Sequence, residues 1–164
     1  MKTQPDGPTC YITTEMGDFT AKFSSAGLRE LRFPSTGKRA ESPGPVPQKW
    51  MELTRSAVLA VLRGEKIKEL PPLDLSGTEF QLAVWKALQQ IPCGQTLSYG
   101  QVAKKIGRPG AVRAVGGACG ANPGPLLIPC HRVLASGQKL GGFSAGLDWK
   151  RRLLEIERVL FKTN

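Results

Sequence analysis

Segments typical of β-strands are concentrated near the start of this chain, and this distribution constrains the fold more than any other feature of the sequence. Aromatic and branched residues cluster at 10–12, 19–23 and 28–33, and turn residues separate these clusters at 16–18 and 24–27. Short apolar segments divided by turn residues predict an antiparallel meander. Because later apolar residues recur mainly at helical spacing, the pattern predicts an α+β fold that begins with a small antiparallel sheet.

The remainder of the N-terminal half predicts a loop, a helix and a linker. Residues 34–47 are rich in proline and glycine and have too few apolar side chains to bury a face, which predicts an exposed loop. From Trp50 to Leu62, apolar residues recur at helical spacing until Gly64 offers a stop signal. We expect this helix to pack on the meander. Prolines and charged residues at 65–77 then predict a linker.

A capping box at Thr78-Glu79-Phe80-Gln81 marks the start of a second, mostly helical part of the chain. Ser98 is a further cap candidate, and a glycine turn follows at 107–110. The sequence predicts successive helices at 80–91, 99–106 and 111–119. Two short helices joined by a tight glycine turn resemble a helix-turn-helix. We therefore predict two domains, residues 1–74 and residues 78–164.

A last helix is predicted near the C-terminus. Asp148 is positioned to cap it. Its expected buried stripe consists of Trp149, Leu153, Ile156 and Leu160. The basic residues around this stripe, which we expect on the outer side, are Lys150, Arg151, Arg152 and Arg158.

Positive charge is unevenly distributed along the chain. The 23 Lys and Arg residues exceed the 13 Asp and Glu residues, so the formal net charge is +10. Most of the excess follows Asp74, and no acidic residue occurs from Phe80 to Leu147. Such a stretch can be a solvated basic face that aids solubility, or it can bind a polyanion. Its length favours the polyanion.

The helix predicted at 111–119 has an unusually bare surface. Small residues fill it, namely Ala111, Ala114, Gly116, Gly117 and Ala118, and Gly120 follows. Arg113 is its one long side chain. Because each glycine costs a helix about 1 kcal/mol relative to alanine, the bare surface should allow some close approach. One interpretation is tight packing against another helix. The other is contact with a DNA minor groove, with Arg113 as a projecting finger.

Cysteine usage and hydropathy limit the class of protein. Apolar residues make up 40% of the chain, which is enough for a core and excludes disordered and fibrous classes. The longest apolar run, 57–62, is too short to span a bilayer, and the N-terminus lacks an apolar leader. We expect a cytoplasmic location, or a nuclear one in a eukaryote. With one histidine and no C-x-x-C pair, the sequence indicates neither a zinc site nor a disulfide framework. Three of the cysteines are interpreted as buried apolar residues: Cys10, Cys93 and Cys119.

Cys130 stands beside the only histidine, His131. Prolines bracket a short apolar segment at 126–128, interpreted as a strand that leads to the cysteine. An imidazole near a thiol lowers the pKa of that thiol and activates it. Adjacent residues of an extended segment point to opposite sides, which favours a bridging water over direct contact between the two side chains. Glu157 is a candidate to orient His131, whereas Glu155 should face solvent. The alternative is a buried cysteine beside a structural histidine.

A family resemblance is carried by three motifs. They are Ile128-Pro129-Cys130-His131-Arg132-Val133, the preceding Ala114-Val115-Gly116-Gly117-Ala118, and Asn122-Pro123. Together they resemble the active-site signature of the O6-alkylguanine-DNA alkyltransferases. The resemblance is strong from Thr78 to about Leu160 and weaker before that. It implies an RNase H-like N-terminal structural domain and a C-terminal DNA-binding and active-site domain with a helix-turn-helix of winged-helix type.

The resemblance also implies roles for individual residues. Cys130 would accept the alkyl group from guanine O6 irreversibly, in a single turnover, and O4-alkylthymine is a further candidate substrate. His131 would take the thiol proton through a water while Glu157 holds the imidazole. Asn122 would brace the turn around the cysteine, Tyr99 would donate its hydroxyl to the guanine ring, and Arg113 would fill the space that the extruded base leaves in the stack. The residues implied to contact DNA closely are Tyr99, Ala114, Gly116 and Gly117. Those implied to form the base pocket are Val133, Phe143, Ser144 and Ala145.

The implied partner is double-stranded DNA that contains alkylated guanine, bound by a monomer that can cluster cooperatively on DNA. We expect no cofactor, no metal and no membrane. Some relatives hold a structural zinc or a fused regulatory domain, and we expect neither here. Two other functions remain open from the sequence: a non-catalytic sensor of alkyl lesions, which the presence of Cys130 disfavours, and a hydrolase that uses Cys130, His131 and Glu157 as a triad.

Overall fold

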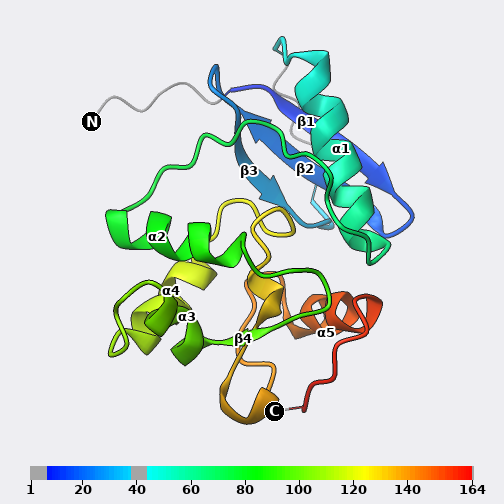
Figure 1. Ribbon diagram of the computed structural model, residues 1–164. Helices are drawn as coiled ribbons and strands as arrows, with labels where there is room; N and C mark the ends of the chain where they lie inside the picture. The colour runs from blue at the N-terminus through cyan, green and yellow to red at the C-terminus, as the bar shows by residue number, and fades with distance from the viewer. Residues whose placement is uncertain (1–6, 38–43, 164) are drawn as a thin grey trace.

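The N-terminal part of the computed structural model is a three-stranded antiparallel sheet with one helix (Figure 1). The structure describes residues 7–37 and 44–163. Its first elements are β1 (Thr9–Thr14), β2 (Gly17–Phe23), β3 (Leu28–Arg32) and α1 (Gln48–Leu62). The sheet order is β1-β2-β3, with Ile12 opposite Phe19 and Ala21 opposite Leu31. The predicted meander and the α+β class are confirmed.

One face of this sheet forms the first apolar core. Alternate residues of β2, namely Phe19, Ala21 and Phe23, are buried, as the two-residue period of a strand requires. They pack with the buried stripe of α1. Leu126, Leu127 and Leu153, distant in sequence, join the same core. The proposed division at residues 74 and 78 therefore stays a prediction, since this core draws on both sides of it.

The C-terminal part is mostly helical and lies beside the sheet layer (Figure 1). Its elements are α2 (Glu79–Leu88), β4 (Leu97–Ser98), α3 (Tyr99–Lys105), α4 (Val112–Gly120), β5 (Val133–Leu134) and α5 (Leu147–Ile156), with short 3-10 turns η1 (Cys130–Arg132) and η2 (Ser136–Gln138). Strands β4 and β5 pair in parallel. Helices α2, α3 and α4 surround a second core that includes Trp85 and Val115.

The predicted capping box at Thr78 is present, and the predicted cap at Ser98 proves to be a second capping box. The Thr78 hydroxyl accepts from the Gln81 N–H at 3.2 Å, and the Gln81 side chain accepts from the Thr78 N–H at 2.9 Å. Ser98 and Gln101 repeat the arrangement at 3.1 and 2.7 Å. Each box satisfies donors that a helix start would otherwise leave unpaired, and this is why local sequence placed the starts of α2 and α3 correctly.

The apolar segment at 126–128 is not a strand. Leu126 has a positive φ of 75°, and the Ile128 N–H donates to the Gly124 carbonyl at 2.8 Å. A positive φ reverses the direction of the chain and cannot continue a ladder. The prediction of a strand here is wrong because the flanking prolines favour a tight turn, and the leucines then point into the first core.

Helix α5 also differs from its prediction. Gly146 is the N-cap, and the exposed Asp148 instead pairs with Arg151 at 3.1 Å. The helix ends at Ile156 and Arg158 has a φ of 58°, so Leu160 lies outside the helix and is 86% exposed. Lys150, expected on the outer side, is fully buried. It shares a face with Leu153 and Leu154, three and four residues on, and this face is the inner one.

Three remaining expectations concern loops, metals and membranes. Of the predicted loop 34–47, residues 38–43 lie outside the described residues, and the described remainder contains neither helix nor strand. No group of three metal-ligating side chains occurs in residues 7–37 and 44–163. Within the same ranges, the helices are too short or too polar to cross a bilayer.

Candidate active site

Cys130 lies in the η1 turn at the bottom of a small pocket. The pocket has a volume of about 120 Å³ and is lined by Tyr99, Gly116, Cys119, Gly120, Cys130, Gly142, Phe143 and Ser144. Several residues that the sequence singled out therefore meet here from α3, α4, η1 and the glycine loop before α5. Val133 is fully buried in the second core and does not line this pocket.

The environment of Cys130 keeps its thiol protonated. Burial raises the pKa of Cys130, and a hydrogen bond with Asn122 and the charge of Lys150 offset that rise only in part. Asn122 spans the turn before the cysteine: its Nδ2 donates to the Ile128 carbonyl at 2.7 Å, and its Oδ1 accepts from the Gly124 N–H at 2.9 Å. Because the thiol is not ionised at rest, attack by sulfur requires a base.

His131 has the geometry and protonation state of such a base. Its Nε2 lies 2.8 Å from Glu157 Oε1, and its Nδ1 is buried with no hydrogen bond to the described residues. Burial lowers the pKa of His131 more than Glu157 raises it, so the ring is neutral. Because an ionised carboxylate only accepts, the single ring proton sits on Nε2. Nδ1 is therefore the basic nitrogen.

Glu157 is the most heavily hydrogen-bonded carboxylate in the described part of the chain. Arg132 Nε donates to Oε1 at 3.2 Å and to Oε2 at 3.0 Å, and Arg132 Nη2 donates to Oε1 at 2.8 Å. The Gly94 N–H donates to Oε2 at 3.1 Å. Burial alone would raise the pKa of Glu157, but the hydrogen bonds and charges of His131 and Arg132 lower it to about 2. Arg132 also donates to the Ile91 carbonyl at 2.7 Å, so this network fixes η1 to the 91–94 loop.

Sequence reasoning missed the part played by Arg132 and by Lys150. The Lys150 Nζ donates to the Val133 carbonyl at 2.7 Å and to the Gly142 carbonyl at 3.0 Å, and it lies 5.9 Å from the Tyr99 ring centroid. Burial lowers the pKa of Lys150 to about 8, although the neighbouring Cys130 and Cys119 thiols raise it. This lysine ties the strand after the cysteine to the glycine loop. The signal available was its place on the face of Leu153 and Leu154.

The bare surface of α4 is open. Ala114 and Gly117 are exposed with Arg113, and Trp85 Nε1 holds the opposite side by donating to the Ala118 carbonyl at 2.8 Å. A Cβ atom placed on Gly116, Gly117 or Gly120 would meet no atom within 4 Å, apart from the helix's own backbone. The interpretation that these glycines allow tight internal packing is therefore wrong, and the surface is available to another molecule.

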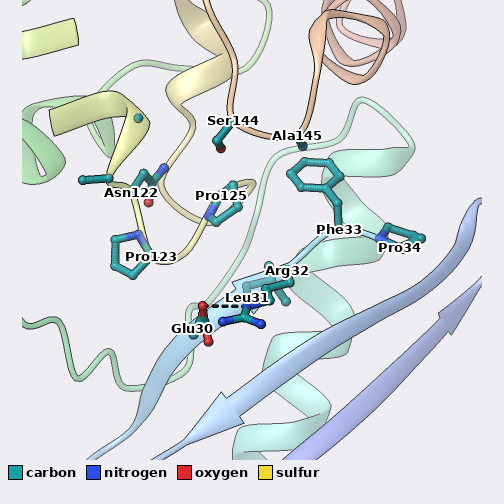
Figure 2. Close-up of a pocket in the computed structure, with 12 residues that line it drawn as sticks. Glu30, Leu31, Arg32, Phe33, Pro34, Asn122, Pro123, Pro125, Ser144 and Ala145 are labelled. Carbon is teal, nitrogen blue, oxygen red and sulfur yellow. Dashed lines mark hydrogen bonds and ion pairs between the residues drawn. The ribbon is translucent and has the colours of Figure 1, made fainter. Parts of the chain in front are cut away.

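A larger cleft adjoins the Cys130 pocket. It has a volume of about 490 Å³ and lies between β3 and the loops that carry Asn122 and Ala145, as Figure 2 shows. Gly120 and Ser144 line both cavities, so the two are neighbours at this edge. Phe33 and the Glu30–Arg32 ion pair, 2.7 Å long, form the N-terminal wall. Of the predicted base-pocket residues, Phe143 lines the small pocket, Ser144 lines both cavities, and Ala145 lines only the cleft.

Comparison with known proteins places the chain in a family. The matching family model, which covers residues 79–159, is described as the DNA binding domain of 6-O-methylguanine DNA methyltransferase. A methylated-DNA–protein-cysteine methyltransferase of Mycolicibacterium paratuberculosis is 57% identical over 86 residues, which are 52% of this chain and 52% of that protein. One of Methanosarcina mazei is 42% identical over 137 residues, covering 80% of this chain and 84% of that protein. A crystal structure of Mycobacterium tuberculosis OGT in complex with DNA is similar with a TM-score of 0.77 and 40% identity, over 90% of this chain and 91% of that chain.

The matched region contains the whole constellation around Cys130, from Tyr99 to Glu157. The alignment with the mycobacterial relative spans about half of that protein. The alignment with the archaeal relative and the likeness to the solved structure extend over most of both chains. The chain therefore belongs to the methylated-DNA–protein-cysteine methyltransferase family.

Proposed function

We propose that this protein repairs DNA by transferring an alkyl group from O6 of guanine to the sulfur of Cys130. The observation that carries the proposal is a buried thiol, next to a neutral histidine, in a small pocket beside the open surface of α4. In the transfer, the sulfur forms a bond to the alkyl carbon while the bond from that carbon to O6 breaks. The electron pair of the broken bond stays on the guanine. Because the resulting thioether is stable, each molecule acts once.

The thiol proton has a defined destination in this proposal. It passes through a water to His131 Nδ1, the basic nitrogen of the neutral ring. The imidazolium that forms then lies against the ionised Glu157, which stabilises it. Arg132 and Gly94 hold Glu157 in place by four further hydrogen bonds in total, so Glu157 is a positioning residue.

Other pocket residues bind and orient the base. Burial raises the pKa of Tyr99, so its hydroxyl remains protonated and can donate to the guanine ring as charge develops. Phe143 forms a wall of the pocket, and backbone groups of Cys130 and Ser144, which also line it, read the base edge. Ala145 lines the neighbouring cleft, and Asn122 braces the turn before the cysteine.

The location of Cys130 requires that the nucleotide leave the duplex. The cysteine is 4% exposed, so it cannot reach a base inside a helical stack. Extrusion costs a few kcal/mol of stacking and pairing. We propose that α4 lies in the minor groove, where Ala114, Gly116 and Gly117 allow close approach and Arg113 fills the vacated stack. The minor groove carries little sequence information, as repair at any sequence requires.

The test is the intact mass of the protein after incubation with duplex DNA that contains one O6-methylguanine. We expect a gain of one methylene, located on Cys130 by peptide mapping, and none in Cys130→Ser. A duplex with O4-methylthymine tests the second candidate substrate. Tight binding of the lesion without a mass gain would instead indicate a sensor of alkyl damage, and turnover of an ester substrate would indicate a hydrolase.

A further inference from the structure

Val112 is an exposed apolar side chain on the open surface of α4. It is 42% exposed and is the first residue of the helix, directly before Arg113. Among the described residues, the other exposed large apolar side chains are Leu82, on α2, and Leu160, near the C-terminus. This exposed valine lies beside a cation, on a helix whose glycines have room for a side chain. Internal packing therefore does not account for it.

The helical period places Val112 in line with the mouth of the Cys130 pocket. Residues four apart share a helix face, so Val112, Gly116 and Gly120 form one row along α4. Gly116 and Gly120 line the pocket. Arg113 and Gly117 form the next row around the helix. Val112 thus continues the row that leads into the pocket, while the arginine finger projects from the neighbouring row.

We propose that Val112 is an apolar wedge that enters the minor groove beside the extruded nucleotide, an inference that rests on the proposed function. Proteins that bend the minor groove often insert apolar side chains between base steps and so hold them unstacked. Valine suits this position because its branched side chain is nearly fixed in a helix and loses little freedom on binding. Arg113 would occupy the place of the missing base, and Val112 would exclude water from the adjacent sugar and base.

The experiment compares rates of methyl transfer from duplex and from single-stranded oligonucleotides with one O6-methylguanine. The variants are Val112→Ala, which removes both methyl groups, and Val112→Thr, which keeps the shape but replaces one methyl group by a hydroxyl. We expect both variants to be about tenfold slower on duplex DNA, since Val112→Ala loses the apolar burial of two methyl groups and Val112→Thr places a hydroxyl where a methyl would be buried. On the single strand, which needs no unstacking, their rates should equal that of the unmodified protein. Leu82→Ala, at a similarly exposed apolar residue, should match the unmodified protein on both.

Two results would overturn the wedge. If both variants transfer methyl from duplex DNA as fast as the protein without substitutions, while Arg113→Ala is slow, then Val112 does not enter the minor groove. If they lose rate equally on the single strand, Val112 acts through the pocket rather than on the duplex. Thermal unfolding midpoints within about 2 °C of the unmodified protein confirm that the variants fold. Absence of transfer by the unmodified protein on either substrate would contradict the proposed function itself, which separates the two failures.

Discussion

The glycines of the N-terminal region and those of α4 have opposite surroundings. A Cβ on Gly64 would lie 2.7 Å from the Ile156 carbonyl oxygen, and one on Gly27 would collide with the Pro72 carbonyl. A Cβ on Gly117 or Gly120 would meet nothing within 4 Å, apart from the backbone of α4 itself. The first pair is required by the fold of the chain itself. The second pair weakens its own helix without making room for another part of the described chain, as the proposed approach of α4 to DNA requires.

Charged side chains also fall into an inward-facing group and an outward-facing group. Within the described residues, ion pairs of the acid-free stretch are confined to Arg132, which is buried against Glu157. The exposed cations of that stretch face outward, among them Lys104, Lys105 and Arg113. Inward-facing groups should therefore control stability, whereas outward-facing groups should control DNA binding. Substitutions that separate these two effects test the comparison.

The largest expected effect is on stability, from Glu157→Gln. The variant leaves the buried Arg132 without a counter-charge, which typically costs about 3 kcal/mol or more. Because the pKa of Glu157 is lowered from 4.5 to about 2 in the folded protein, its contribution is present above pH 4.5 and is lost as the pH falls toward 2. Urea unfolding between pH 7 and pH 2 measures both the stability lost in the variant and the pH dependence that Glu157 contributes. Glu155→Gln, at an exposed carboxylate two residues earlier, should behave as the unmodified protein. Equal stability of the two variants at pH 7 would contradict the structural role of Glu157.

Next in size is a loss of DNA-dependent activity, from Gly117→Leu. A leucine on the open face of α4 should hold the helix away from the groove and slow methyl transfer from duplex DNA about 100-fold, equivalent to the few kcal/mol that extrusion requires. Stability should not fall, because nothing near this face is displaced. Ser56→Leu, at an exposed position of α1, is the matched control and should keep full activity. Normal transfer by Gly117→Leu would show that α4 does not approach DNA.

Substitution of a glycine that is packed against other residues should instead lower stability and leave activity unchanged. Gly64 has a φ of 69°, and Gly64→Ala adds both backbone strain and contact with Ile156, for a loss of about 2 kcal/mol of unfolding free energy. The folded variant should transfer methyl groups at the same rate as the protein without the substitution. Gly107→Ala shares the positive φ of 72° but has open space around it, so it should lose about 1 kcal/mol. Thermal unfolding and the mass-shift assay measure the two quantities, and equal losses would mean that the contact with Ile156 is unimportant.

The smallest expected effect is on salt dependence. If Lys104 neutralises a phosphate, Lys104→Ala should reduce the slope of log affinity against log salt by about 1. Lys49, on α1, is equally charged and 73% exposed, and it pairs with Glu69 at 3.6 Å. Lys49→Ala should leave the slope unchanged in fluorescence anisotropy titrations. A similar change of slope in both variants would mean that the basic charge acts diffusely over the whole surface.

Local patterns predicted much of this fold because their causes lie within a few residues. The turn residues that separate β1, β2 and β3 are adjacent to the strands they divide. The capping boxes of α2 and α3 are closed by side chains three residues apart. The same locality explains the errors. Asp148 was an acceptable cap by type, but Gly146 occupies that place, and the flanking prolines that suggested a strand at 126–128 instead support a turn.

The sequence by itself determined the α+β class, the helix-turn-helix pattern, the basic character of one half and the pairing of a cysteine with the only histidine. The tertiary structure alone decided which charges face inward. Lys150 is buried because the carbonyls of Val133 and Gly142 converge on it, and Glu157 is ionised because Arg132, His131 and Gly94 all donate to it. It also decided that the glycines of α4 face open space. These properties depend on groups distant in sequence, since the cost of burying a charge is set by everything that surrounds it in the folded chain.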